Sequence, residues 1–152
     1  MRSFAIVAVT AAMLFFGFVA ASNAATTPTQ FGFGTGGGFT NPCNGDPVSF
    51  FVTGTGLVVP SAGTFLVKEH GVGTGSDGVT GETYDVTFDL IGTNALDGSG
   101  SFTGHVVIVF VGQVSKATTV VHSVANVNFR PTDPSIVEIQ YATCAGVGQQ
   151  GF

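Results

Sequence analysis

The chain has 152 residues and carries 9 acidic against 4 basic side chains, so its formal net charge at pH 7 is −5. Such a sparsely charged, acidic surface is a poor partner for nucleic acids and for anionic lipid headgroups. The 23 glycines, the many threonines and valines, and the lack of a helical pattern after residue 24 favour an all-β domain joined by tight turns.

Residues 1–24 have the features of a secretory signal peptide. Arg2 precedes a largely apolar stretch at residues 4–20, and the small residues that follow suit cleavage before Ala25. The alternative is an uncleaved membrane anchor, because the apolar stretch approaches the length of about 17 to 25 residues that a spanning helix needs. The small residues favour cleavage, so we expect a secreted protein, extracellular or periplasmic, with no membrane span after cleavage.

Residues 25–41 are rich in glycine and phenylalanine and predict a flexible arm in front of the folded domain. Their glycines are too many for a stable helix or a central strand. Phe31, Phe33 and Phe39 either fold back onto the domain or dock onto a partner. We therefore treat these three side chains as a candidate interaction surface.

A single β-domain is expected at residues 42–146, followed by a short tail at 147–152. Its predicted strands lie between turn residues, at 48–59, 64–70, 82–91, 102–114, 117–129 and 136–143. The links are short apart from a glycine-rich stretch, and none has the helical pattern that a parallel crossover requires. The sequence therefore predicts an antiparallel meander of about six strands, and at most eight.

Two cysteines bracket these predicted strands. An exported chain with an even number of cysteines is expected to oxidise them, so Cys43 and Cys144 should form a disulfide. A disulfide requires Cα atoms within about 7 Å, so the first and last strands of the meander should be neighbours. We therefore expect the sheet to close into a small barrel, with a β-sandwich as the alternative.

No motif in the sequence indicates an enzymatic activity or a cofactor. Residues 73–78 match the glycine spacing of a dinucleotide-binding loop, but a strand rather than a helix should follow them, so a hairpin loop is expected. His70, His105 and His122, with Glu69, come from different strands and form a candidate polar or metal-binding cluster. Nothing in their spacing requires a metal, and we expect no catalytic residue and no cofactor.

The segment Asn41-Pro42-Cys43-Asn44-Gly45-Asp46-Pro47-Val48 stands at the start of the predicted domain. It resembles the Asn-Pro-Cys-x-Gly-acidic turn that opens the mature domain of a group of exported bacterial proteins of unknown function. The resemblance covers about residues 40–146, although Asp46 and Pro47 stand where the group would have glutamate and a residue other than proline. It implies an all-β secreted domain and assigns no functional residue.

These observations predict a non-catalytic binding or surface-interaction protein with an unknown extracellular or cell-surface partner. One alternative is a carrier of a small apolar ligand inside the barrel, which requires about eight strands. The other alternative is an enzyme, which requires the histidines and carboxylates to meet in one pocket.

Overall fold

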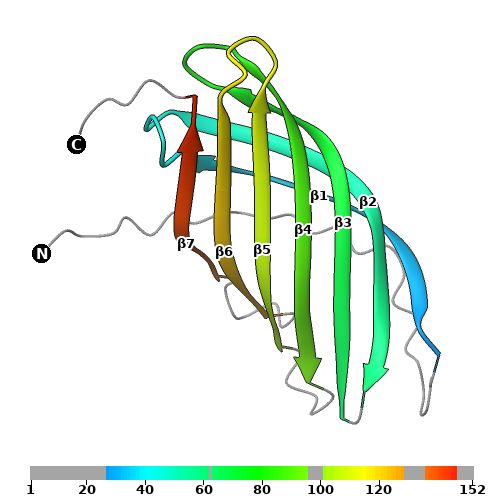
Figure 1. Cartoon of the computed structure of the whole chain (residues 1–152). Coiled ribbons are helices and arrows are strands. Elements are labelled where there is room, and N and C mark those ends of the chain that lie inside the picture. Colours follow the sequence, from blue (N-terminus) through cyan, green and yellow to red (C-terminus); the bar gives the residue numbers. More distant parts are fainter. Residues whose placement is uncertain (1–26, 62, 96–100, 129–135, 147–152) are drawn as a thin grey trace, which may run out of the picture.

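The structure is a computed structural model that describes residues 27–61, 63–95, 101–128 and 136–146. These residues form one antiparallel sheet in which the order of the strands follows the chain (Figure 1). The strands are β1 (Thr29–Thr40), β2 (Pro47–Ser61), β3 (Thr64–Asp77), β4 (Thr83–Ala95), β5 (Ser101–Gly112), β6 (Thr118–Asn128) and β7 (Ile136–Ala145). The predicted all-β meander is confirmed, with seven strands instead of about six.

The predicted signal peptide and the tail at 147–152 lie outside the described residues, as do residues 25 and 26 of the predicted arm. Within the described ranges, no helix has the length and hydrophobicity of a membrane span.

The seventh strand is β1, which occupies most of the segment predicted to be a flexible arm. It pairs with β2 in an unbroken register from Thr29 opposite Val58 to Thr40 opposite Pro47. The prediction of an arm was wrong for this segment because glycine weakens a strand without preventing one. Alternating phenylalanines on the buried side compensate for the glycines between them.

Side chains alternate across the sheet and define two faces. The inner face carries the hydrophobic core, whose buried members are Phe39, Val48, Val52, Tyr84, Val86, Phe88, Leu90, Val106, Ile108, Phe110 and Val121. The outer face is the opposite side and carries polar groups such as Asp85 and Asp89 together with exposed apolar groups such as Phe51 and Val72. One wet face and one buried face are typical of an antiparallel sheet.

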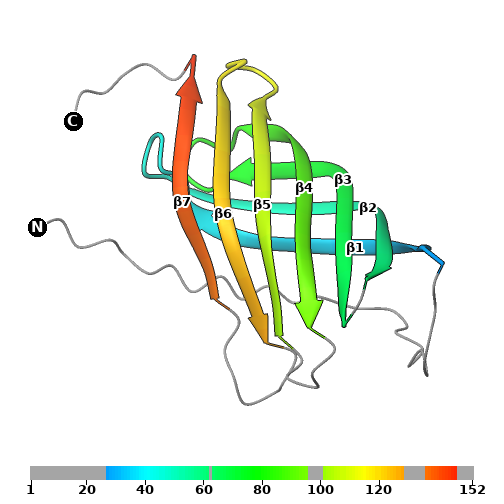
Figure 2. The same ribbon diagram turned by 60° about the horizontal axis from the view of Figure 1, so that its bottom comes forward.

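The sheet bends so strongly that its first strands cross the layer formed by β4–β7 (Figures 1 and 2). Contacts between aromatic rings stabilise this crossing. The ring centroids of Phe33 and Phe88 lie 5.8 Å apart. The ring centroid of Phe110 lies 5.2 Å from that of Phe39 and 5.6 Å from that of Phe50. The strands that carry these pairs are not neighbours in the sheet. The core therefore forms between two parts of one folded sheet.

Glycines on the inner face of β2 and β3 permit the bend. A Cβ atom at Gly54 would collide with the carbonyl oxygen of His70, and one at Gly73 would collide with that of Phe51. Neighbouring backbones approach this closely only where no side chain intervenes. The glycine-rich stretch from Gly71, which was predicted to be a loop, is therefore strand as far as Asp77.

Among the described residues, β1 pairs only with β2 and β7 pairs only with β6, so the sheet is not closed into a barrel. The prediction that the first and last strands are hydrogen-bonded neighbours assumed an even number of strands starting after Cys43. With β1 added, the two edge strands run in the same direction and cannot pair antiparallel with each other.

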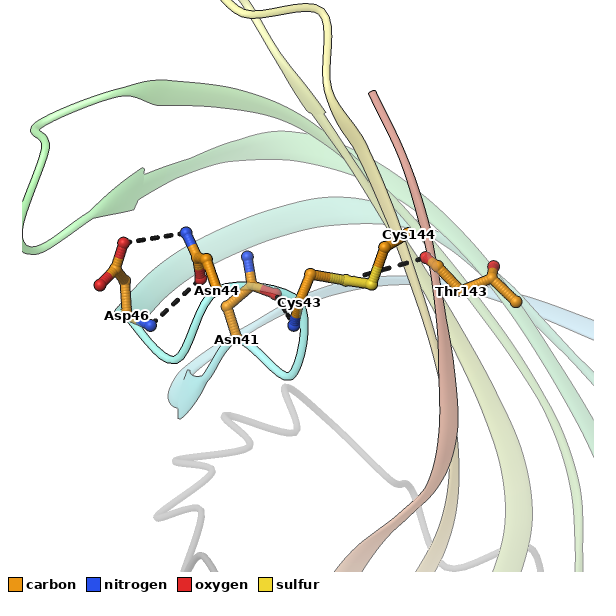
Figure 3. The surroundings of a disulfide bond; sticks show 6 residues. All are labelled: Asn41, Cys43, Asn44, Asp46, Thr143 and Cys144. Atoms are coloured by element: carbon orange, nitrogen blue, oxygen red, sulfur yellow. Dashed lines mark hydrogen bonds between the residues drawn. A yellow bond between two sulfur atoms is a disulfide. The ribbon is translucent and has the colours of Figure 1, made fainter. Parts of the chain in front are cut away.

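The predicted disulfide is present and joins Cys43, in the turn between β1 and β2, to Cys144 in β7, with the Cα atoms 5.8 Å apart (Figure 3). The turn is braced by its own side chains. Asn41 Oδ1 accepts a hydrogen bond from the Cys43 N–H over 2.9 Å, and Asn44 Oδ1 accepts one from the Asp46 N–H over 3.1 Å. The disulfide thus ties a rigid turn at one edge of the sheet to the strand at the other edge.

Candidate functional site

A shallow hollow of about 510 Å³ lies on the outer face over the central strands. Two rows of side chains, set by the strand register, supply most of its lining. In the first row, Thr55, His70, Asp89 and Val107 stand opposite one another on β2 to β5, and in the second row Leu57, Lys68, Ile91 and His105 do the same. Directly opposed residues have Cβ atoms about 5 Å apart, so each row forms a continuous strip of side chains.

The shortest polar contact in this hollow joins His70 and Asp89. Nδ1 of His70 lies 2.7 Å from Oδ1 of Asp89, and the two side chains are 64% and 55% exposed. A pair this open to water contributes little to stability, about 1 kcal/mol at most. Its main effect is to orient the imidazole, whose Nε2 has no hydrogen-bond partner among the described residues.

The hollow combines positive or polar groups with apolar ones. Lys68 and the two histidines stand beside the side chains of Leu57 and Ile91. The lining also includes the carboxyl groups of Asp89 and Glu69, and Asp89 is paired with His70. The arrangement offers hydrogen-bond donors and a positive charge next to an apolar patch, which suits a ligand with an anionic group and an apolar part.

The predicted cluster of three histidines and Glu69 does not assemble. Glu69, His70 and His105 are among the residues that line the hollow, but His122 stacks on Tyr141 with ring centroids 4.2 Å apart. Glu69 occupies the inner-face register, opposite Gly56 and Leu90. Within the part of the chain that the structure describes, no group of three or more His, Cys, Asp or Glu side chains is placed to hold a metal ion.

Glu69, like Asp77, is an acidic side chain that the register directs to the inner face of β3. The ring of Phe31 lies against Gly56, directly opposite Glu69, and Leu90 flanks Glu69 on the other side. This burial raises the pKa of Glu69 to about 7, and no hydrogen-bond partner offsets the cost among the described residues. Glu69 is therefore a carboxyl group that is partly protonated near neutral pH.

The three phenylalanines predicted to form an interaction surface face inward. Phe39 is 8% exposed and belongs to the core, Phe33 packs against Phe88, and Phe31 covers Gly56. Alternation along β1 thus places these rings on the inner face, where Phe39 is buried and Phe31 and Phe33 are partly buried.

Sequence reasoning did not identify Lys68 and Asp89 as site residues. Asp89 was recognisable as a residue on the wet face of a strand, but its contact with His70 depends on the register between β3 and β4. Which residues face each other across the two strands can be inferred only when the length of the β3–β4 turn is known. A register shift of one residue moves every side chain to the other face.

No protein-family model, curated protein or solved structure matches this chain. The resemblance of residues 41–48 to the opening turn of exported bacterial proteins therefore stays a prediction.

Proposed function

We propose that this chain is an exported binding protein with one disulfide bond and no catalytic activity. We also propose that the hollow on its outer face binds the ligand. The observation that carries the proposal is the alignment of Lys68, His70 and His105 beside Leu57 and Ile91 on neighbouring strands. Rigid strands hold these side chains in place, so the site needs little reordering on binding.

The chemistry of the hollow favours a small apolar acid as the ligand. Lys68 supplies a positive charge for a carboxylate, and with Asp89 on Nδ1 the Nε2 of His70 donates a hydrogen bond to the carboxylate when the imidazole is protonated. The hydrocarbon part of the ligand would lie over Leu57 and Ile91. The disulfide supports export, because such bonds persist outside the reducing cytosol.

The second candidate is a carrier that holds an apolar ligand against the inner face of a barrel closed by a further strand. The observation that favours it is the half-buried carboxyl group of Glu69, which could donate a hydrogen bond to a polar head group when protonated. Against this reading, the inner face is already filled by aromatic contacts such as Phe50–Phe110 and Phe39–Phe110.

Methyl NMR with octanoate as the probe and octanol as its neutral control separates the two candidates. Binding in the hollow shifts the methyl signals of Leu57 and Ile91, which line it, whereas carriage shifts those of Val106 and Ile108, which are buried on the inner face and do not line the hollow. Octanol is expected to bind at least tenfold more weakly than octanoate in the hollow, because it cannot pair with Lys68.

Matched charge variants complete the test. Lys68→Gln should weaken octanoate binding at least fivefold, while Lys116→Gln, in an exposed turn away from the hollow, should leave it unchanged. Equal effects of the two substitutions, or no shift at Leu57 and Ile91, would rule out the hollow as the acid-binding site.

A further inference from the structure

Among the described residues, one edge of β1 has no partner strand, and this free edge lacks the features with which proteins protect exposed strands. Its 12 residues contain no charged side chain and no proline, and its register with β2 has no bulge. Its outer-face positions at 32, 34, 36 and 38 are all glycine, so β1 places no side chain of its own there, although the ring of Phe51 on β2 lies near Gly34 and Gly36. A long, uncharged edge of this kind is a template for pairing with another strand.

The other edge is better protected. The register of β7 against β6 shifts between His122 and Ser123, and such irregularities disrupt the regular edge that a further strand needs. The sequence of β7 also includes an acidic residue, Glu138. The two edges therefore differ, and β1 is the one suited to strand addition.

The direction of the edges specifies how an added strand would run. Each consecutive pair of strands is antiparallel, so β1 and β7 point the same way. A strand antiparallel to β1 is then also antiparallel to β7, and it would be the eighth strand of the sheet. Eight is the number at which small antiparallel barrels commonly close.

We propose that the free edge of β1 binds a single extended segment of another polypeptide by antiparallel strand addition, independently of the ligand hollow on the outer face. The layer of β4–β7 crosses β1 at ring-contact distance, with Phe33 on Phe88 and Phe39 on Phe110 (Figure 2). An added segment occupies only one strand position beside β1, whereas an edge strand of a second copy of this chain would bring its whole sheet against the crossing layer. We therefore take a lone segment as the occupant.

The structure also specifies the chemistry of that segment. Its inward-facing residues would meet the apolar inner face, so they should be apolar and uncharged, whereas its outward-facing residues can be polar. At one end the Cys43–Cys144 disulfide bridges the two edges and limits how far the segment can extend. The partner is thus an extended peptide with alternating apolar and polar residues.

The test uses the oxidised, purified protein and a synthetic peptide of alternating valine and threonine with lysine at each end. The control peptide has proline in place of the central valine, which removes a ladder hydrogen bond. Binding is measured by fluorescence anisotropy, and hydrogen exchange locates the bound peptide. We expect micromolar binding of the first peptide, at least tenfold weaker binding of the second, and at least tenfold slower exchange of β1 amides.

Two lysine variants test the edge directly. At Gly32 an added Cβ would have only ordinary contact, 3.9 Å from Gly54 O, so Gly32→Lys places a charge on the edge strand without a collision. It should weaken peptide binding at least fivefold. Val72→Lys puts the same charge on the outer face of β3, where Val72 is 58% exposed, and should leave binding unchanged.

Three results would overturn the proposal. The first is no peptide binding up to 1 mM, about the weakest affinity expected for a specific complex. The second is protection confined to β7 or to the outer face. The third is binding that appears only after residues 1–26 are removed, because the occupant of the edge would then be the chain's own N-terminal segment.

Discussion

Tyr84 donates a hydrogen bond from its hydroxyl group to Oδ2 of Asp77 over 3.3 Å, at the end of the inner face where β3 turns into β4. Oδ1 of the same carboxylate accepts hydrogen bonds from the N–H groups of Val79 and Thr80, over 2.8 and 2.7 Å. Asp77 is only 3% exposed. The β3–β4 turn is therefore organised around one buried carboxylate.

The charge on Asp77 should stabilise the fold above about pH 4. Burial alone would raise the pKa of Asp77, but the hydrogen bonds from Thr80, Val79 and Tyr84 outweigh it and hold the pKa below its ordinary value of 3.8. The stabilisation is present above the unfolded-state pKa and is lost as the pH falls through the folded-state pKa. Asp77→Asn should lower the free energy of unfolding by about 1 to 3 kcal/mol at pH 7.

Urea denaturation between pH 2 and pH 7 measures this effect. The difference between wild type and Asp77→Asn should shrink as the pH falls below 4. Asp85→Asn is the control, because Asp85 is exposed and accepts one hydrogen bond, from Gln113 Nε2 over 2.8 Å. A difference for Asp77→Asn that does not change with pH would show that the charge has no part in the stabilisation.

Glu69 should have the opposite influence on stability. Because burial raises its pKa from 4.5 to about 7, the folded state keeps the proton between these values and the unfolded state releases it. The free energy of unfolding should therefore fall as the pH rises from about 5 to 7. Glu69→Gln should remove this slope and, after allowance for partial solvent screening, be more stable than wild type at pH 8 by roughly 1 kcal/mol.

Thermal denaturation at pH 5 and pH 8 checks the prediction for Glu69. Glu82→Gln provides a comparison, since hydrogen bonds from Ser115 lower the pKa of Glu82 and its substitution should not raise stability at pH 8. An unchanged pH slope in Glu69→Gln would mean that the carboxyl group reaches water in solution.

Much of this fold could be predicted because alternation and turn residues are local signals. The strand around Tyr84, Val86 and Phe88 is an example, and so is the cysteine pair. The bend could not be predicted, because it depends on glycines such as Gly54 and Gly73 lying against the backbone of a neighbouring strand. A glycine-rich strand and a glycine-rich loop have the same composition, so β1 was mistaken for an arm.

The site was less predictable than the fold. His70 and His105 were recognised as candidates, but the separation of Glu69 from them follows from period-two alternation, which places adjacent residues 69 and 70 on opposite faces. The predicted strand at 64–70 already contained both residues, so this separation could have been inferred from the sequence. The prediction ended the strand at His70, where the structure continues it to Asp77.

Lys116 occupies a position that two other turns fill with glycine. Three turns share one hydrogen-bond pattern, in which the N–H of the first residue donates to the carbonyl oxygen five residues later. These turns run from Asn41 to Asp46, from Asp77 to Glu82 and from Gly112 to Ala117. Each has a left-handed residue at the same place, Gly45 with φ 83°, Gly81 with φ 72° and Lys116 with φ 58°. A side chain is strained in this conformation, so Lys116 is the mismatched member of the set.

Lys116→Gly should therefore stabilise the protein. Relief of about 1 to 2 kcal/mol of left-handed strain is partly offset by the entropy of glycine in the unfolded chain, about 0.5 to 1 kcal/mol. We expect a net gain of roughly 0.5 to 1 kcal/mol in the free energy of unfolding. Lys116→Ala is the control: it keeps the strain and loses the hydrogen bond from Nζ to the Gln113 carbonyl, so it should give no gain.

Gly73 should tolerate no side chain. A Cβ atom there would collide with the carbonyl oxygen of Phe51 and lie 2.7 Å from the Cα atom of Val52, and neither is a flexible group that can move aside. Gly73→Ala should cost more than about 3 kcal/mol or prevent folding. Gly38→Ala should stay within about 0.5 kcal/mol of wild type, because its Cβ would lie 3.5 Å from Val48 O. Circular dichroism during thermal unfolding of both variants measures the difference.

Removal of the disulfide should destabilise the protein through its unfolded state. Cys43 and Cys144 are 101 residues apart, and closing a loop of this length is worth about 4 to 5 kcal/mol in the chain-entropy model. The double substitution Cys43→Ala and Cys144→Ala should lower the free energy of unfolding by about 2 to 5 kcal/mol. Reduced wild-type protein is the control and should match the double variant in urea denaturation. A double variant as stable as oxidised wild type would mean that the turn and β7 are held together without the bond.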